Sequence, residues 1–365
     1  MFAQRMAVLG TGLIGGSIAL GARSRNRRLT VVGFDGDPAT AAAALSRGAL
    51  TSLAASPEEA VAGADLIVLA MPIDRIAVTC EQLAGAVGET AAVTDVGSAK
   101  EEVVAAGEAA FGGRFVGAHP MAGSERHGID AADARLFEDA WWVLTPTANT
   151  SSDAYSRVAG LATSLGAKTV AVDPVTHDAL VARLSHVPQL TASALVDMAL
   201  TGSDKEALLG LAGAGFRDVT RIAASNPDLW VAILRSNKAA VGEALAALEK
   251  RIELVADMIA GDSWDELRSW LDTARVARLE LFAKPDYDRE PIFLSMIVPD
   301  RPGVLAEVTT EAGRLGTNIE DLRIVHSTEG GRGRLELVVA GDKAADILSD
   351  SLTRLGYRVE RSEFE

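Results

Sequence analysis

A glycine-rich turn near the amino terminus is the feature that most constrains how this chain can fold. Apolar residues 6–9 predict a buried strand, a G-x-G-x-x-G turn follows over residues 10–15, and a helical pattern comes next. In such a unit Gly10 makes the tight turn, Gly12 lets a pyrophosphate approach the backbone, and Gly15 lets helix and strand pack closely. The exposed N–H groups at the start of the helix favour an anion. The turn therefore predicts a dinucleotide-binding unit.

An acidic residue supports this interpretation. The second predicted strand, residues 30–35, ends at Asp35, about 20 residues after Gly15. A carboxylate there can bind both ribose hydroxyls of NAD and would repel the 2′-phosphate of NADP, so NAD is the expected cofactor. Two alternatives stay open: Asp35 as a mere helix cap, and NADP bound with help from nearby arginines (Arg23, Arg25, Arg27 and Arg28). The predicted cofactor contacts are Gly10, Gly12, Leu13, Ile14, Gly15 and Asp35.

Hydrophobic periodicity divides the chain into three parts. Strands alternate with helices up to residue 174, and the strand over residues 65–71 is apolar throughout, as a strand buried on both faces should be. Residues 175–284 show only long helical patterns, including single helices over 177–199 and 227–260. After a polar, proline-bounded linker, the remaining residues follow a β-α-β-β-α-β order. The expected fold is an α/β Rossmann-type domain at 1–174, an all-α helical domain at 175–284, and an α+β ferredoxin-like domain at 291–365.

Composition excludes several classes of function. The net charge of −15 argues against a nucleic-acid or anionic membrane partner. It also means that an anionic substrate must be met by locally placed basic side chains. The single cysteine, Cys80, and the lack of an apolar run of about 20 residues favour a cytoplasmic protein. The histidines lack the spacing of metal ligands, so no metal site is expected.

His119 is the leading catalytic candidate. It follows the apolar strand 115–118, and loops at the carboxyl ends of parallel strands are where open α/β sheets place their chemistry. Beside a nicotinamide, a neutral imidazole can accept the proton of a hydroxyl while hydride leaves the same carbon. Ser98, at the end of the preceding strand, could bond the other ring nitrogen and fix its tautomer, and it could also serve as a helix N-cap. The alternative for His119 is that it only caps the end of its strand.

Basic residues of the helical domain could meet a substrate carboxylate. Arg217 and Arg221 lie in a glycine-flanked helix start, and arginine is the residue best suited to bidentate carboxylate binding. The alternative is a pair of surface salt bridges. His186 lies within an otherwise apolar helical run, where a lone histidine is more often a satisfied core residue.

These motifs resemble those of the prephenate dehydrogenases, the enzymes of tyrosine biosynthesis. The resemblance covers almost the whole chain and includes D-x-G-S-x-K at 95–100, H-P-M-A-G-x-E at 119–125, S-H-V-P at 185–188 and G-A-G-F-R-D at 213–218. The first two motifs, in that order, are far more specific than the glycine turn. The chain begins directly at the nucleotide-binding strand, so we expect no chorismate mutase domain of the kind fused to some relatives.

The resemblance implies NAD-dependent oxidative decarboxylation of prephenate to 4-hydroxyphenylpyruvate. His119 would accept the proton of the ring hydroxyl, and Ser98 would orient His119. Glu125 would gate or polarise the site. The substrate contacts implied by the resemblance are Arg221, which matches an arginine that holds a substrate carboxylate, together with His186, Glu125, Ser124 and Arg217.

The carboxyl-terminal domain resembles an ACT domain. Asp300, Gly303, Asn318 and Ile319 stand at the usual ligand-binding positions of such domains. The resemblance implies regulation by an aromatic amino acid, tyrosine being the expected ligand, at an interface between two ACT domains. The helical domain implies a homodimer.

Three rival functions stay open. Arogenate carries an ammonium where prephenate has a keto group, and Glu125 could pair with it, so arogenate dehydrogenase is the close rival. A catalytically inactive sensor, with an ACT domain on a nucleotide-binding scaffold, is a rival of another class. A β-hydroxyacid dehydrogenase would use a lysine of the helical domain, and Lys238 is available.

Overall fold

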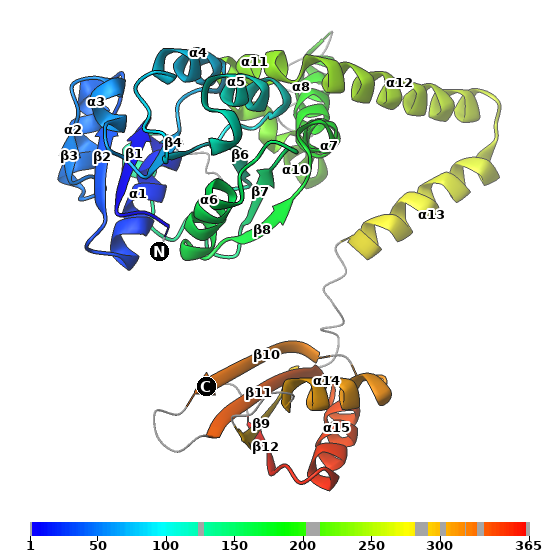
Figure 1. Ribbon diagram of the computed structural model, residues 1–365. Coiled ribbons are helices and arrows are strands. Elements are labelled where there is room, and N and C mark those ends of the chain that lie inside the picture. Colours follow the sequence, from blue (N-terminus) through cyan, green and yellow to red (C-terminus); the bar gives the residue numbers. More distant parts are fainter. Residues whose placement is uncertain are drawn as a thin grey trace. The chain divides into compact units, whose positions relative to one another are not determined.

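The computed structural model describes residues 2–122, 128–201, 212–281, 291–299, 304–317, 319–326 and 332–362. The chain separates into two compact units, Met1–Leu254 and Val255–Glu365. The first unit holds a large sheet with helices on both faces, and the second ends in a small sheet with two helices on one side (Figure 1).

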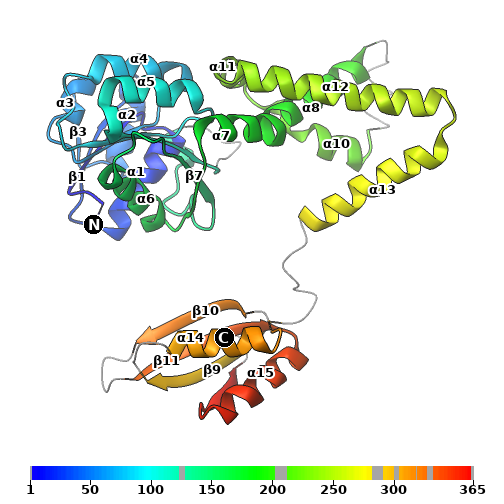
Figure 2. The ribbon, with the colours of Figure 1, turned by 45° about the vertical axis from the view of Figure 1, so that its right-hand side comes forward.

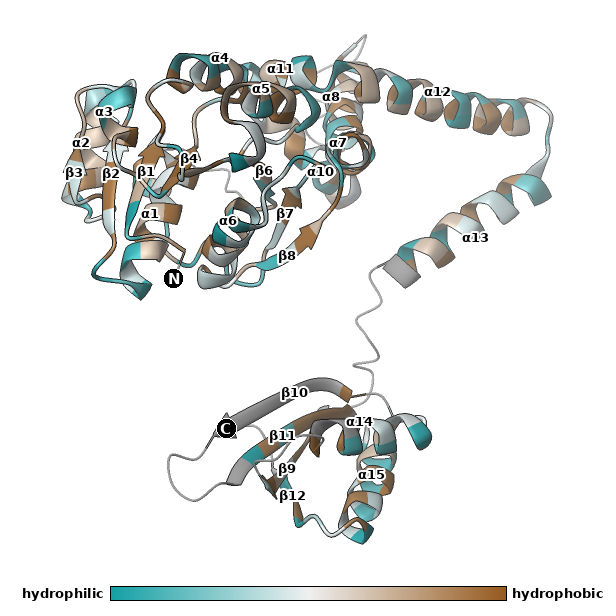
Figure 3. Cartoon of the chain, viewed as in Figure 1, coloured by the Kyte–Doolittle hydropathy of each residue, from teal (hydrophilic) through white to brown (hydrophobic). Residues whose placement is uncertain are grey.

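Within the described residues, eight strands form the sheet of the first unit in the order β3-β2-β1-β4-β5-β6-β7-β8. All neighbours pair in parallel except β6 and β7, which are antiparallel. The central strands β1 and β4 are apolar and almost completely buried, as strands covered on both faces should be (Figure 3). The strands are β1 (Arg5–Leu9), β2 (Thr30–Phe34), β3 (Ser52–Leu53), β4 (Leu66–Leu69), β5 (Ala92–Asp95), β6 (Phe115–Pro120), β7 (Trp141–Thr145) and β8 (Lys168–Ala171).

Helices cover both faces of this sheet. One apolar cluster joins the sheet to α1 (Leu13–Arg25), α2 (Pro38–Ser46) and α6 (Ser152–Ser164). A second cluster joins the other face to α3 (Pro57–Val61), α4 (Ile73–Leu83) and α5 (Glu101–Phe111). Figure 1 and Figure 2 agree in placing α4 and α5 on one side of the sheet and α1 and α6 on the other. This is the Rossmann-type arrangement that the glycine turn predicts, and short 3₁₀ turns lie at η1 (Gly112–Arg114) and η2 (Ile129–Ala131).

The part of the chain after β8 is helical, as predicted, but two of the expected long helices are interrupted. A π-helical turn, η3 (Ala182–His186), separates α7 (Pro174–Val181) from α8 (Val187–Leu200). Asn237 leaves helical geometry at φ −117° and ψ 33°, and so separates α11 (Pro227–Ser236) from α12 (Lys238–Ala260). Each interruption contains a side chain of the site described below. The remaining described helices are α10 (Ala214–Thr220), the 3₁₀ turn η4 (Arg221–Ala224) and α13 (Trp264–Leu281).

The carboxyl-terminal sheet has the predicted β-α-β-β-α-β order. Its strands are antiparallel in the order β10-β11-β9-β12, and α14 and α15 pack on the sheet through an apolar cluster. The bounds are β9 (Pro291–Pro299), α14 (Val304–Arg314), β10 (Ile319–His326), β11 (Arg332–Ala340), α15 (Asp342–Arg354) and β12 (Val359–Ser362). No described helix of the chain is both long enough and apolar enough to span a bilayer.

Candidate active site

The glycine turn has the shape that a dinucleotide requires. Gly10 adopts φ +91°, and a Cβ added there would lie 2.4 Å from the carbonyl oxygen of Ala70. A Cβ at Gly15 would lie 1.9 Å from the carbonyl oxygen of Gly10. A Cβ at Gly12 would meet no protein atom within 4 Å. Packing therefore requires glycine at the first and third positions, whereas the second faces open space, where a pyrophosphate would approach the first turn of α1.

A cavity of about 610 Å³ lies beside this turn at the carboxyl ends of β1, β2 and β4, and its lining includes Gly12, Asp35, Met71 and Arg75. The Asp35 carboxylate accepts hydrogen bonds from the backbone N (2.6 Å) and the hydroxyl (3.1 Å) of Thr11. These bonds hold Asp35 in the cavity wall. Asp35 is not a helix cap, because Asp37 caps α2 by accepting from Ala39 N and Thr40 N. The cavity, the open approach at Gly12 and the carboxylate fit a dinucleotide.

The arginines that kept NADP open lie elsewhere. Arg23 donates to the carbonyl oxygens of Gly48 and Leu50, and Arg25 pairs with Glu138 at 2.8 Å. Both stand in the last turn of α1, about 15–18 Å along the helix from its first residue, Leu13. Arg75, which the sequence analysis did not single out, is an arginine that does line the cavity.

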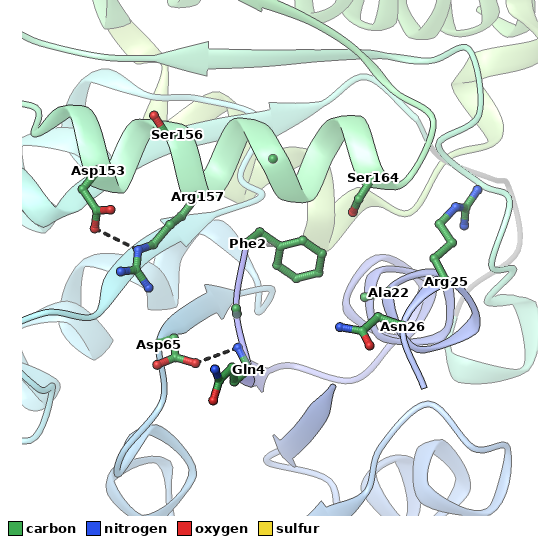
Figure 4. A pocket seen from close by; sticks show the side chains of 12 residues that line it. Phe2, Gln4, Ala22, Arg25, Asn26, Asp65, Asp153, Ser156, Arg157 and Ser164 are labelled. Atoms are coloured by element: carbon green, nitrogen blue, oxygen red, sulfur yellow. Dashed lines mark hydrogen bonds and ion pairs between the residues drawn. The ribbon is translucent and has the colours of Figure 1, made fainter. Parts of the chain in front are cut away.

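A larger hollow of about 950 Å³ lies at the opposite end of the sheet, between α1 and α6 (Figure 4). Phe2 points into it, and its charged side chains are already paired: Arg157 with Asp153 at 2.8 Å, and Asp65 with the backbone N of Gln4 at 2.7 Å. Because α/β sheets bind ligands outside the carboxyl ends of their strands, the amino-end hollow is not the candidate active site.

His119 lies at the carboxyl end of β6, close to the end of the sheet that carries the glycine turn. Its Nδ1 is 3.0 Å from Nε2 of His177, and the two rings meet edge to face. Burial lowers the pKa of His119 well below its usual value of 6.5, and the neighbouring His177, Lys100 and His186 lower it further. His119 is therefore a neutral imidazole at neutral pH, as a proton acceptor must be.

The orienting contact predicted for Ser98 is made by another residue. Between Ser98 and His119, both of which are described, the structure records no hydrogen bond, and the recorded partner of Nδ1 of His119 is His177. Nor does Ser98 cap α5. That helix begins at Glu101, and its first N–H groups donate to Asp178. A role for Ser98 toward His119 stays a prediction.

A buried ion pair supports the peptide that precedes His119. The Lys100 ammonium pairs with the Asp95 carboxylate, and neither side chain has any exposed surface. Lys100 Nζ also donates to the carbonyl oxygen of Ala118 (2.9 Å), and the N–H of Ala118 donates to Asp95 (3.1 Å). The acid and the lysine of the D-x-G-S-x-K motif thus hold both polar groups of Ala118. The motif was recognised from sequence, but this role of its two ends was not.

The helical part contributes a second buried group of polar side chains. Nδ1 of His177 lies 2.7 Å from Asp178 Oδ1. The Asn237 amide donates to the backbone oxygen of Asp178 (2.9 Å) and lies 3.2 Å from Nδ1 of His186. His186 is 1% exposed, and its ring meets Trp230 edge to face. Burial lowers the pKa of His186 to about 4. His186 is thus buried with its Nδ1 beside Asn237, and its contact with substrate stays a prediction.

The other predicted site residues are placed as follows. Arg217 lies on α10 and Arg221 begins η4, and both are exposed. Ser124 and Glu125 lie outside the described residues, as do Asp300, Gly303 and Asn318 of the predicted ACT ligand site. Ile319 begins β10, where it pairs with Val339. Among the described residues, no His, Cys, Asp and Glu side chains are grouped as metal ligands would be.

The fold and these side chains define the class: a dinucleotide-binding α/β protein. Its neutral histidine and its nucleotide cavity both lie at the carboxyl ends of the strands. Comparison with known proteins narrows the class. Residues 18–171 match the model of the prephenate dehydrogenase nucleotide-binding domain, residues 173–273 that of the prephenate dehydrogenase dimerization domain, and residues 294–357 that of an AHAS small subunit-like ACT domain.

Whole-chain relatives agree. The chain is 33% identical to the prephenate dehydrogenase of Bacillus subtilis over 341 residues, which cover 91% of each chain. The prephenate dehydrogenase of Aquifex aeolicus, solved with hydroxyphenyl propionate and NAD⁺, matches 76% of this chain and 98% of its own at 31% identity and a TM-score of 0.72. An arogenate dehydrogenase from Synechocystis matches 76% of this chain and 99% of its own at 30% identity and a TM-score of 0.69. This chain belongs to the prephenate dehydrogenase family.

Proposed function

We propose that this enzyme catalyses the NAD-dependent oxidative decarboxylation of prephenate to 4-hydroxyphenylpyruvate. The observation that carries the proposal is His119, a neutral imidazole at the same edge of the sheet as the nucleotide cavity. Family membership and the ligands named for the Aquifex aeolicus structure support it. The buried contact of His119 with His177 weighs against a catalytically inactive sensor, and the family assignment weighs against a β-hydroxyacid dehydrogenase.

NAD⁺, when bound, supplies the hydride acceptor. Gly10, Gly12, Gly15 and the first turn of α1, which includes Leu13 and Ile14, would hold its pyrophosphate, and Asp35 would bind the adenosine ribose. His119 takes the proton of the ring hydroxyl as hydride leaves the same carbon. Loss of the ring carboxylate as CO₂ then aromatises the ring, and His119 returns the proton to the oxygen. Prephenate and NAD⁺ thus give 4-hydroxyphenylpyruvate, CO₂ and NADH with no net proton released.

The substrate carries two carboxylates, and the chain carries a net charge of −15. The Lys100 ammonium is committed to Asp95, so it cannot supply the binding charge. We assign that role to Arg221, with Arg217 on the preceding turns and the buried His186 as further contacts. Arginine suits the role because its planar fork can bind a carboxylate through two parallel hydrogen bonds. Ser124, Glu125 and Ser98 complete the proposed set.

Steady-state kinetics with purified protein test this function. We expect NADH formation with prephenate, and His119→Asn should retain NAD⁺ affinity while kcat falls by about 10²–10⁴-fold. Near-normal turnover by this variant would remove His119 from its role. Because an arogenate dehydrogenase is among the structural relatives, arogenate is the second candidate substrate. A higher kcat/KM for arogenate than for prephenate on the same preparation would decide for it.

The carboxyl-terminal domain is proposed to regulate the enzyme by binding tyrosine. Its support is the described ferredoxin-like sheet and the match to an ACT-domain model. Tyrosine should inhibit prephenate turnover and raise the melting temperature of the full chain, with glycine as the control amino acid. No effect of tyrosine on either measurement would overturn this assignment.

A homodimer formed through the helical part is also proposed, and a cytoplasmic location stays a prediction. The dimer is supported by the match to a dimerization-domain model and by large apolar side chains exposed on α12 and α13, among them Ile252 at 58%, Ile259 at 50% and Leu271 at 54%. Leu271→Asp should shift the mass measured by light scattering toward the monomer. Val78→Asp, at an exposed valine of α4, is the matched control. An unchanged mass for Leu271→Asp would argue against α13 as an interface.

A further inference from the structure

Two side chains, His177 and Asp178, connect the interior of the helical part to the imidazole of His119. Asp178 Oδ1 lies 2.7 Å from Nδ1 of His177, and Nε2 of His177 lies 3.0 Å from Nδ1 of His119. The side chains of His177 and Asp178 are only 2% and 3% exposed, so water does not substitute for these contacts. Both residues stand in the first two turns of α7, whereas His119 is the penultimate residue of β6.

The position of the Asp178 carboxylate is set by the backbone of another element. Its Oδ1 accepts from the N–H of Lys100 (2.7 Å), and its Oδ2 accepts from the N–H of Glu101 (2.9 Å). These N–H groups lie at the start of α5, where helices leave donors without internal partners and where a negative charge is favoured. Three donors, two of them backbone groups, therefore hold the ionised carboxylate in one orientation.

The direction of each proton follows from this orientation. An ionised carboxylate can only accept, so Nδ1 of His177 carries a proton. In a neutral His177 ring, Nε2 is then an acceptor, and Nδ1 of His119 must donate to it. A neutral His119 with its proton on Nδ1 has a lone pair on Nε2. That nitrogen is the one left to receive a proton from a substrate.

We propose that His177 and Asp178 are positioning residues that keep the proton of His119 on Nδ1 and so hold its Nε2 ready as the base. This inference rests on the proposed function only for its kinetic consequence, because the tautomer itself can be observed without substrate. The logic is that of a catalytic triad, in which a carboxylate fixes the tautomer of the histidine that moves the proton. Here a second imidazole stands between the carboxylate and the base.

Nitrogen-15 NMR of the full-length protein labelled at histidine tests the tautomer directly. The chain has five histidines, so His119→Asn and His177→Gln suffice to assign the two signals of interest. We expect the His119 signals to show a protonated Nδ1 and an unprotonated Nε2 at pH 7. A proton on Nε2 of His119 in the wild-type protein would overturn the proposal.

Kinetics of matched variants test the consequence. Asp178→Asn can donate to Nδ1 of His177 and reverse both tautomers, so kcat should fall by about 10²–10⁴-fold with KM and NAD⁺ affinity nearly unchanged. His177→Leu should lose a similar factor, whereas His177→Gln, which offers a carbonyl oxygen to Nδ1 of His119, should recover at least tenfold of it. Asp173→Asn is the control. Asp173 caps the same helix by accepting from Thr176 N, and it takes no part in the contacts that join Asp178 to His119.

The outcomes separate the two proposals. If the wild-type protein converts neither prephenate nor arogenate, the proposed function fails while the NMR result still decides the tautomer. If the wild-type protein is active and both Asp178→Asn and His177→Leu keep more than a third of its kcat, the positioning role is wrong. Equal activity of His177→Leu and His177→Gln would also contradict it, because a purely structural role does not depend on an acceptor at that position.

Discussion

The ammonium of Lys100 and the carboxylate of Asp95 form an ion pair with no exposed surface on either side chain. Burial lowers the pKa of Lys100, and the Asp95 carboxylate opposes that shift. Both partners also bond to Ala118, the residue before His119. The pair therefore connects the stability of this end of the sheet to the placement of the proposed base, His119.

Removing one partner should be costly. Lys100→Met leaves the Asp95 carboxylate buried without a counter-charge, and we expect the free energy of unfolding to fall by about 3–5 kcal/mol. Asp95→Asn combined with Lys100→Met should recover part of this loss, because neither member of the pair then carries a buried charge. Chemical denaturation of the two single variants and the double variant gives the coupling energy. A double variant that loses the sum of both single losses would show that the two side chains act independently.

Asp35 should set the choice of cofactor. Asp35→Asn keeps the acceptor for Thr11 N but removes the charge that repels a 2′-phosphate. We expect the ratio of kcat/KM for NAD⁺ over NADP⁺ to fall by about 10- to 100-fold, which corresponds to about 1.4–2.8 kcal/mol. The control is Asp37→Asn, which alters the cap of α2 two residues further on. An unchanged ratio would mean that the ribose is recognised by another residue.

Activity should persist below the pH at which an ordinary histidine takes up a proton. Burial and the neighbouring His177, Lys100 and His186 keep the pKa of His119 well below 6.5, so the base stays neutral as the pH falls through 6.5. The acidic limb of the kcat/KM profile, which reports the free enzyme, should therefore lie below pH 6.5. A limb centred at or above 6.5 would indicate a different base or a more exposed His119.

His186 should make the fold more stable at neutral pH than at acidic pH. Its pKa is about 4 in the folded chain, chiefly through burial, and about 6.5 when unfolded. Between these values the unfolded state binds the extra proton, so stability is complete above pH 6.5 and declines as the pH falls toward 4. His186→Gln should reduce the difference between the unfolding free energies measured at pH 7 and pH 4.5. A variant with the same pH dependence as the wild type would exclude His186 as a contributor.

Much of the fold follows from local patterns, and the site follows only in part. The glycine turn directly follows strand β1, and Asp35 directly follows strand β2. The spacing between them in the sequence is therefore enough to predict the nucleotide cavity. His119 can be located for the same reason. His177 and Asp178 escaped notice because their partners are 58 and 78 residues away in the chain. The only local signal was a His-Asp dipeptide that begins three residues after the proline that starts α7.

The interruptions of the long helices show why periodicity misses such features. Residues 227–260 have the apolar spacing of one helix, yet Asn237 departs from it to bond Asp178 and approach His186. The π turn η3 ends at His186, whose side chain lies in the same part of the interior as Asn237. Such π turns frequently occur at functional sites. The contact of Asn237 with Asp178 overrides the local helical propensity, and the residues next to Asn237 in the sequence do not predict it.

The carboxylate of Asp178 caps a helix that precedes it by more than 70 residues, and this has a practical consequence for exchanging parts between relatives. A chimera joined near residue 174, where the sequence suggests a boundary, would combine the α5 start of one parent with the α7 of the other. Asp178 would then come from one parent, and the Lys100 and Glu101 N–H groups that it accepts from would come from the other. A junction placed after Val181 takes Asp178, His177 and His119 from a single parent. It is therefore the better place to recombine these enzymes.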